Sequence, residues 1–186
     1  MTGGSKGELH IADDDALRTA ASLGDREAFD VIVLRYGPML HRYGRRMLAD
    51  EADVVQDTFV AAWRQIGAFR GSSSLRTWLF SICYRKIVDT YRVKRAQPVE
   101  DWILEPAAVD TTADPFAKVS NSAFLAALEQ ALAELPARQR ATWMMREIEQ
   151  MTFPEIGEVL QLSADAVRGH HHRATGTLRV LLSRWQ

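Results

Sequence analysis

Residues 151–174 read MTFPEIGEVLQLSADAVRGHHHRA, and this stretch decides how the C-terminal part of the chain folds. Thr152 and Glu155 have the spacing of a capping box. In this motif the threonine side chain accepts a hydrogen bond from the backbone N–H of the glutamate, and the glutamate side chain accepts one from the backbone N–H of the threonine. After a turn at Gln161-Leu162, Ser163 can cap a second helix. Two short helices joined by a tight turn, the second rich in arginine and histidine, predict a helix-turn-helix.

The second helix divides into two faces. Four residues, separated by four, three and four positions, are predicted to face the interior: Val167, His171, Ala174 and Leu178. A second set projects elsewhere and could contact phosphates and base edges: Arg168, His170, His172 and Arg173. A plain helical hairpin with a solvated basic face would give the same pattern, so the residues alone leave both explanations open.

The three consecutive histidines do not predict a metal site. Consecutive helical residues point about 100 degrees apart, so His170, His171 and His172 cannot converge on one ion as an i, i+4 pair can. No cysteine or carboxylate at a suitable spacing completes a ligand set. We therefore expect no metal and no other cofactor.

Upstream, helical periodicity without strand-like alternation runs over residues 13–95. Gly37-Pro38 predicts a kink or junction, and Ser74 can cap a helix that runs from Leu75 to about Arg95. Residues 96–118 lose this period and hold three prolines and five acids against one lysine, so they predict an acidic linker. Helical periodicity returns from Val119. The chain is thus expected to be all-α, with a disordered N-terminus over 1–12 and two small helical domains over 13–95 and 119–186.

Charge is unevenly distributed along the 186 residues, although the net charge is only −1. Residues 8–30 have a balance of −5, whereas residues 64–95 reach +7 and residues 163–186 reach +3. Clustered positive charge is typical of proteins that bind polyanions, because displaced counterions supply much of the affinity for phosphate. A solvated helical face explains the charge equally well at this point.

No stretch approaches the roughly 20 apolar residues that span a bilayer, and Met1 to Asp15 is polar, so we expect a cytoplasmic protein without membrane insertion. The only cysteine, Cys83, lies in an apolar run and is expected to be a buried thiol. Trp78, Leu79 and Ile82 follow the helical period beside the same run and are assigned to the core.

Three segments together resemble the extracytoplasmic-function class of sigma factors in the sigma-70 family. Residues 50–63 (DEADVVQDTFVAAW) resemble the signature of its region 2, and residues 69–79 (FRGSSSLRTWL) resemble the segment that follows. Residues 135–140 (LPARQR), 151–157 (MTFPEIG) and 166–174 resemble its region 4. The motifs follow the family's order and spacing from about residue 50 to 178, with only the linker omitted.

The resemblance implies a promoter-directing factor rather than an enzyme. It implies that region 2 binds the clamp helices of the largest polymerase subunit through Asp50, Asp53, Val54, Gln56 and Asp57. The −10 element would be held and melted by Phe69, Arg70, Ser72, Ser73, Ser74, Arg76, Arg85, Lys86, Arg92 and Arg95. The −35 element would be read by Ser163, Arg168, Gly169, His170, His172 and Arg173. Further expected partners are the polymerase flap and an anti-sigma factor, and the linker would thread the RNA exit path.

Three residues depart from the family pattern. Arg85 stands where asparagine is usual, Gly169 where serine is common, and His171 where an aliphatic residue packs. A glycine inside the recognition helix costs up to about 1 kcal/mol relative to alanine, and an inward histidine needs a hydrogen-bond partner or must stay neutral. These departures bear on the promoter sequence and on the rigidity of the helix.

Three other functions are compatible with parts of the pattern. A sigma mimic would bind an anti-sigma factor without touching DNA, but both basic regions are retained. A duplex-binding regulator would not need the motif of residues 50–63. A nucleic-acid enzyme would need a convergent acid, base, nucleophile or metal constellation, and none is visible in the sequence.

Overall fold

The computed structural model describes residues 12–48, 51–94 and 119–185. In these ranges the regular elements are all helical and no strand occurs, so the predicted all-α class is confirmed. The predicted linker over 96–118 and, apart from Ala12, the predicted disordered N-terminus lie outside the described residues. No helix in the described ranges is both long enough and apolar enough to cross a bilayer.

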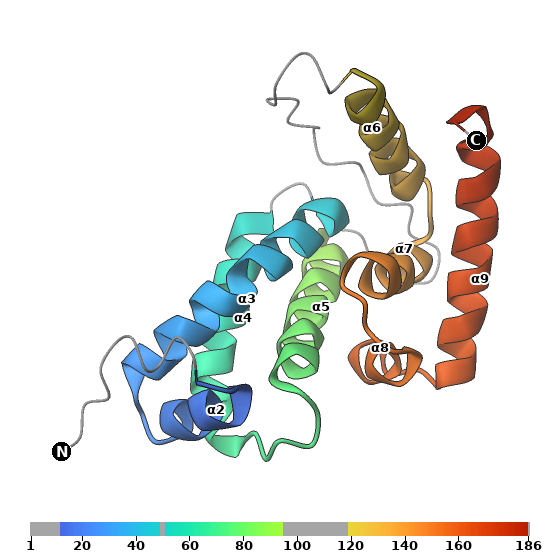
Figure 1. The fold of residues 1–186 in the computed structure, drawn as a ribbon. Coiled ribbons are helices and arrows are strands. Elements are labelled where there is room, and N and C mark those ends of the chain that lie inside the picture. The colour runs from blue at the N-terminus through green and yellow to red at the C-terminus, as the bar shows by residue number, and fades with distance from the viewer. Residues whose placement is uncertain (1–11, 49–50, 95–118, 186) are drawn as a thin grey trace.

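Within the described residues, four α-helices make up the N-terminal half (Figure 1). They are α2 (Asp14–Ser22), α3 (Arg26–Met47), α4 (Glu51–Gln65) and α5 (Leu75–Lys94), with a 3-10 helix at Ile66–Ala68. Aspartates cap the N-termini of α2 and α3. The side chain of Asp13 accepts a hydrogen bond from the backbone N–H of Ala16, and that of Asp25 accepts one from the backbone N–H of Ala28. Ser74 accepts from the backbone of Thr77, which confirms the predicted cap of α5.

Gly37-Pro38 was predicted to be a kink or a junction between helices, and the junction is wrong. Helix α3 continues through Pro38 for 22 residues. Proline lacks the N–H that would bond the carbonyl four residues earlier, but that carbonyl belongs to Leu34, whose side chain is 64% exposed. Packing of Ile32, Leu40 and Tyr43 on both sides of the proline outweighs its local preference.

The C-terminal half is a second set of helices. They are α6 (Val119–Ala133), α7 (Ala137–Trp143), α8 (Phe153–Leu160) and α9 (Ala164–Leu181), with a π-helical turn at Met144–Ile148 and a 3-10 helix at Ser183–Trp185. Thr152 and Glu155 make both hydrogen bonds of the predicted capping box. Ser163 accepts from the backbone of Ala166 and caps α9, also as predicted.

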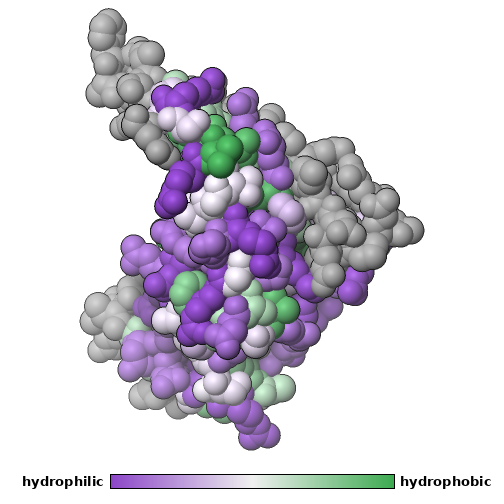
Figure 2. All heavy atoms as spheres, turned by 90° about the vertical axis from the view of Figure 1, so that its right-hand side faces the viewer, coloured by the Kyte–Doolittle hydropathy of each residue, from purple (hydrophilic) through white to green (hydrophobic). Residues whose placement is uncertain are grey.

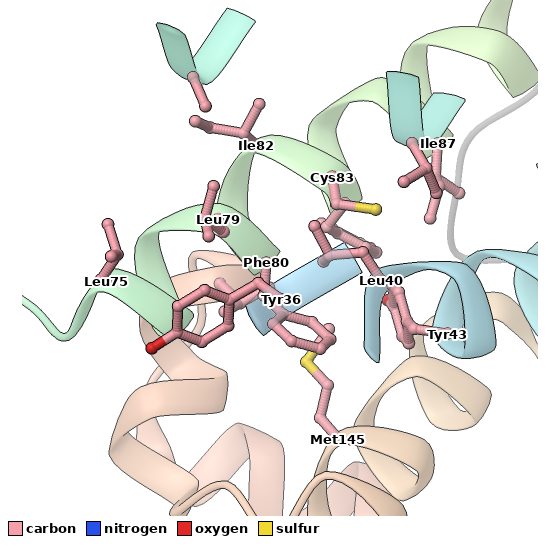
Figure 3. Close-up of a cluster of buried hydrophobic side chains, with 14 of the residues drawn as sticks. Tyr36, Leu40, Tyr43, Leu75, Leu79, Phe80, Ile82, Cys83, Ile87 and Met145 are labelled. Atoms are coloured by element: carbon pink, nitrogen blue, oxygen red, sulfur yellow. The ribbon is translucent and has the colours of Figure 1, made fainter. Parts of the chain in front are cut away.

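One hydrophobic core joins the two halves. It runs from α3, α4 and α5 into α7 and α8, whereas α6 packs on α9 in a smaller cluster around Leu132 and Leu135. Met145 comes from the C-terminal half and points toward the aromatic residues of α3 and α5, where Tyr43 lies edge-on to Phe80 (Figure 3). All three side chains are fully buried, so the contact between the halves is part of the protein interior.

Candidate polymerase and nucleic-acid interfaces

Helix α4 places most of the predicted polymerase-binding residues on its solvent side. Asp53, Gln56 and Asp57 are exposed. Val54 is only 5% exposed and packs in the core, so it supports the helix from beneath and offers no surface to a partner. Asp50 lies outside the described residues. The structure thus brings a polar, acidic stripe of three side chains to one face.

An apolar groove adjoins this stripe between α3 and α4. Its volume is about 930 Å³, and its lining includes Leu34, Gln56, Val60 and Trp63. Leu34 and Val60 are 64% and 43% exposed, which is unusual for large apolar side chains beside a hollow surface. Neither Leu34 nor Val60 was predicted as a site residue. The sequence signal that could have identified them is an apolar residue outside the periodic, inward-facing positions of its helix.

The predicted −10 loop combines one buried and several exposed residues. Phe69 is 8% exposed and stacks on Trp78, with ring centroids 4.5 Å apart and planes 11° apart. Arg70, Ser72 and Ser74 are exposed and Ser73 is half-buried. Gly71 has a φ of +72°, which favours glycine at this turn. The loop therefore presents its polar residues to solvent, while Phe69 anchors it to α5.

Along α5 the predicted −10 cations differ in their surroundings. Arg85 and Arg92 are exposed, and Lys86 is half-buried. Arg85 donates to the carbonyl of Ser81 and Arg92 pairs with Asp89, both on the same helix. Arg76 instead donates to the carbonyl of Glu149 at 3.2 Å and to the carboxylate of Glu155 at 3.4 Å. Arg95 lies outside the described residues. One of the predicted DNA contacts is thus occupied by the C-terminal half.

A second arginine of the N-terminal half is also bound across the junction. Both nitrogens of the Arg42 fork donate to Glu149, Nε to Oε1 at 3.0 Å and Nη2 to Oε2 at 2.8 Å. The Glu149 side chain is 1% exposed and that of Arg42 is 39% exposed. Bidentate pairs of this kind fix orientation as well as adding energy. This pair was not predicted, because its members are 107 residues apart in the sequence.

Arg140 ties α6 and α7 to the N-terminal half. Its guanidinium is buried, with Nη1 donating to the carbonyl of Arg46 at 2.9 Å and Nε donating to the carbonyl of Leu132. Burial lowers the pKa of Arg140 to about 10, so the group stays protonated at neutral pH. Arg46 also pairs with Glu129 of α6 at 3.3 Å.

Glu155 has an anion-stabilising environment. Partial burial by itself raises the pKa of its carboxyl, but the backbone and hydroxyl of Thr152 and the guanidinium of Arg76 outweigh this, and the net pKa lies below the usual value. The carboxylate therefore serves two roles, as part of the capping box of α8 and as the partner of Arg76.

The turn between α8 and α9 depends on a close approach. A Cβ at Gly157 would lie 2.6 Å from the carbonyl oxygen of Leu162, so a larger residue would push the turn apart. Gln161 ends α8 in the left-handed conformation, with a φ of 55°. Together they give the tight turn that a helix-turn-helix needs.

Helix α9 has the two predicted faces. Val167, Ala174 and Leu178 are buried, as expected. The predicted −35 residues lie elsewhere on the helix: Ser163, Arg168, His172 and Arg173 are exposed, and Gly169 and His170 are half-buried. Figure 2 views the side of the molecule that carries α9 and shows mainly hydrophilic surface, interrupted by smaller hydrophobic areas. Exposed Val180 and Leu181 lie at the C-terminal end of this helix.

The histidines of α9 point to different partners. Nδ1 of His170 lies 3.3 Å from Nη2 of Arg173, and Nε2 of His171 lies 2.7 Å from Oε1 of Glu147. His171, predicted to face inward, is 22% exposed and has found the partner that such a position requires. Cys83 is buried as predicted, and burial raises its pKa to about 12.

Comparisons with known proteins agree with this architecture. The family model for sigma-70 region 2 matches residues 32–97, and the model for sigma-70 region 4 matches residues 125–178. The chain is 34% identical to the RNA polymerase sigma factor CnrH of Cupriavidus metallidurans, over 91% of this chain and 94% of that one. It is 31% identical to the ECF sigma factor SigM of Mycobacterium tuberculosis, over 95% and 88%.

Two solved structures share the fold. CnrH in complex with the cytosolic domain of CnrY superposes with a TM-score of 0.70 at 32% identity, covering 92% of this chain and 97% of that chain. The sigma factor RpoE of Bartonella quintana, in complex with the anti-sigma factor NepR, gives a TM-score of 0.67 at 22% identity, covering 83% and 96%. The chain therefore belongs to the extracytoplasmic-function sigma factors of the sigma-70 family.

Proposed function

We propose that this sigma factor uses three separate surfaces, two on a region 2 domain spanning 13–95 and one on a region 4 domain spanning 119–186, joined by the linker at 96–118. Sigma factors bind core RNA polymerase and direct it to promoters, and they are initiation factors rather than enzymes. The observation that carries the assignment of surfaces is the capped helix-turn-helix, whose α9 buries one face and exposes Arg168, His172 and Arg173 on another.

Polymerase binding is assigned to α4 and the groove beside it. The exposed stripe of Asp53, Gln56 and Asp57 would meet polar groups on the clamp helices of the largest subunit. The groove next to it, with exposed Leu34 and Val60, would accept apolar side chains of the same helices. An apolar centre with a polar rim is the usual composition of a specific protein interface.

Recognition of the −10 element is assigned to the loop at 70–74 and to α5. Exposed Arg70 and Ser72 offer donors to an unstacked base, while Phe69 holds the loop on Trp78. The hydroxyl of Ser74 donates to Thr77, so Ser74 shapes the start of α5. Arg85, Lys86 and Arg92 are placed along α5 to hold the phosphate backbone. Arg76 could join them only after it releases Glu149 and Glu155, so loading on DNA would require region 4 to move away from this part of region 2.

Recognition of the −35 element is assigned to α9. Arg168 and His172 lie on the exposed face, with Gly169 between them in sequence. Arg173 folds toward His170 on the same helix, and a Cβ at Gly169 would lie 3.4 Å from its Nη1. In the major groove such side chains would contact base edges, and phosphates would position the helix.

An anti-sigma factor is the expected regulatory partner. CnrH, which matches over 92% of this chain with a TM-score of 0.70, was solved in complex with the cytosolic domain of CnrY. The relationship supports a similar cytoplasmic complex here. A sigma mimic that does not touch DNA would not need exposed cations on α5 and α9.

Paired variants test the assignment of surfaces. The double variant Asp53→Ala/Asp57→Ala should lose binding to core polymerase, measured by co-purification, while Glu27→Ala/Asp30→Ala removes two exposed acids of α3 and should not. The double variant Arg168→Ala/Arg173→Ala should bind core normally and lose promoter complexes that depend on the −35 element. Normal transcription by both the α4 and the α9 variants would refute the assignment.

A further inference from the structure

A cluster of five side chains joins three elements near the start of the recognition helix. Arg146 and Glu147 belong to the π-helical turn, Phe153 is the first residue of α8, and Arg168 and His171 belong to α9. Single π-helical turns are rare inside helices and occur often at functional sites. The cluster lies beside the residues proposed to read DNA, and of its five members only Arg168 belongs to that set.

The centre of the cluster is the contact between His171 and Glu147. Nε2 of the imidazole lies 2.7 Å from Oε1 of the carboxylate. The imidazole is 22% exposed, whereas the carboxylate-bearing side chain is 46% exposed. The contact ties α9 to the turn that follows α7, which an aliphatic residue at position 171 could not do.

Phe153 links this contact to Arg168. The Phe153 ring lies edge-on to the imidazole of His171, with centroids 5.6 Å apart. The guanidinium carbons of Arg146 and Arg168 lie 4.8 Å and 5.6 Å from the same ring centroid. Cations over an aromatic face are attracted to it, most strongly where water is partly excluded. Arg168 also pairs with Asp165 on its own helix.

We propose that Glu147 and His171 are positioning residues for readout of the −35 element: their contact fixes Phe153, and Phe153 with Asp165 fixes the guanidinium of Arg168. The inference rests on the proposed function of α9. A guanidinium held in place before binding loses less rotamer freedom when it contacts a base. The pair therefore sets how strongly the promoter sequence is discriminated, without touching DNA itself.

The contact between His171 and Glu147 also engages the negative charge of the Glu147 carboxylate. Glu147 is nearly half exposed and stands next in sequence to Arg146, on the side of region 4 that carries α9. A carboxylate near the DNA repels phosphate, and the donor of His171 engages part of that carboxylate. Loss of the donor would thus both loosen Phe153 and leave the carboxylate without its partner.

Two substitutions at position 171 separate the hydrogen bond from packing. His171→Leu restores an aliphatic side chain and removes the donor. His171→Gln keeps an amide donor near the position of Nε2. Each variant is assembled with core polymerase, and its binding is compared on one promoter fragment with the −35 element intact or replaced. The ratio of the two binding constants measures discrimination, and the melting temperature monitors folding.

We expect His171→Leu to lower this ratio about fivefold, the scale of one hydrogen bond. His171→Gln should stay within about twofold of the unsubstituted protein, because the donor is retained. Both variants should bind core normally. An unchanged ratio in His171→Leu would overturn the inference. If the unsubstituted protein itself shows no discrimination, it is the proposed function of α9 that fails.

The same comparison can be made from the other side of the contact. Glu147→Ala removes the acceptor, and Glu147→Gln retains one at the same position. Because the side chain is 46% exposed, neither change should prevent folding. The alanine variant should lose discrimination and the glutamine variant should keep most of it. Equal ratios for the two would contradict a positioning role.

Discussion

The basic residues of regions 2 and 4 differ in what surrounds them. In region 2, Arg42 and Arg76 reach across to Glu149 and Glu155 of region 4, and Arg46 reaches Glu129. In region 4, Arg168 and Arg173 remain exposed, and their partners among the described residues belong to their own half. Arginines therefore serve two purposes: Arg42, Arg46 and Arg76 hold the halves together, whereas exposed arginines of both regions, among them Arg92 and Arg168, stay available to phosphate.

The largest effect is expected from a substitution in the apolar centre of the junction between regions 2 and 4. Met145→Ala should lower the free energy of unfolding by about 2–5 kcal/mol, because it leaves a cavity among buried aromatic side chains. Chemical denaturation measures the change. Leu23→Ala is the matched control, since Leu23 is 85% exposed and should shift the same quantity by less than about 0.5 kcal/mol. Similar effects for both would mean that the halves do not share a core.

The next largest effect is expected at the Arg42–Glu149 pair. Glu149→Ala should destabilise the protein by about 1–3 kcal/mol, because it removes both acceptors of a bidentate contact. Arg42 is partly exposed and can recover water, which limits the loss. Small-angle scattering should show a larger radius of gyration for the variant.

A double-mutant cycle separates this contact from other effects of the substitution. If the pair holds the halves together, Arg42→Ala should add little once Glu149 has been removed. Fully additive losses, with an unchanged radius of gyration, would show that the pair is incidental to the junction.

A smaller effect is expected from single exposed cations. Arg173→Ala should weaken promoter binding by about 1 kcal/mol and reduce the slope of log affinity against log salt by about one unit. By contrast, Arg46→Ala should leave the salt slope nearly unchanged, because its guanidinium pairs with Glu129. Filter binding over a series of salt concentrations compares the two. Equal slopes for both variants would remove the distinction between occupied and available cations.

The smallest expected effect is a dependence of stability on pH at Glu155. Its pKa is lower in the folded protein than the usual value, so the ionised form adds stability above the unfolded pKa. This contribution is lost as pH falls through the folded pKa, and should amount to less than about 1 kcal/mol, because both partners keep access to water. Glu155→Gln should flatten the acid side of the stability curve. A curve identical to that of the unsubstituted protein would exclude the Arg76 contact as a source of stability.

Local chemistry made part of this structure predictable. Ser74, Thr152 and Ser163 cap helices through hydrogen bonds that span three residues, and the inward spacing of Val167, Ala174 and Leu178 follows one helical period. These signals depend only on residues that lie a few positions apart in the sequence. The helix-turn-helix and the all-α class were therefore accessible from the sequence.

Long-range packing decided the rest. Pro38 should interrupt a helix locally, but buried neighbours on both sides hold α3 continuous. Val54 and Phe69 carry family motifs, yet their surfaces are covered by the core and by Trp78. Arg76 resembles a DNA-binding cation in sequence, and only the folded chain brings Glu149 and Glu155 to it. Contacts between residues more than 70 positions apart have no periodic signature.

Transcription in vitro tests whether this protein directs core polymerase to promoters. Purified core polymerase is incubated with a pool of genomic promoter fragments, with and without this protein, and start sites are mapped. The account predicts new starts that share two motifs about one and a half turns of DNA apart, and their loss with the Asp53→Ala/Asp57→Ala variant. Core polymerase that neither binds the protein nor gains any new start site would contradict it.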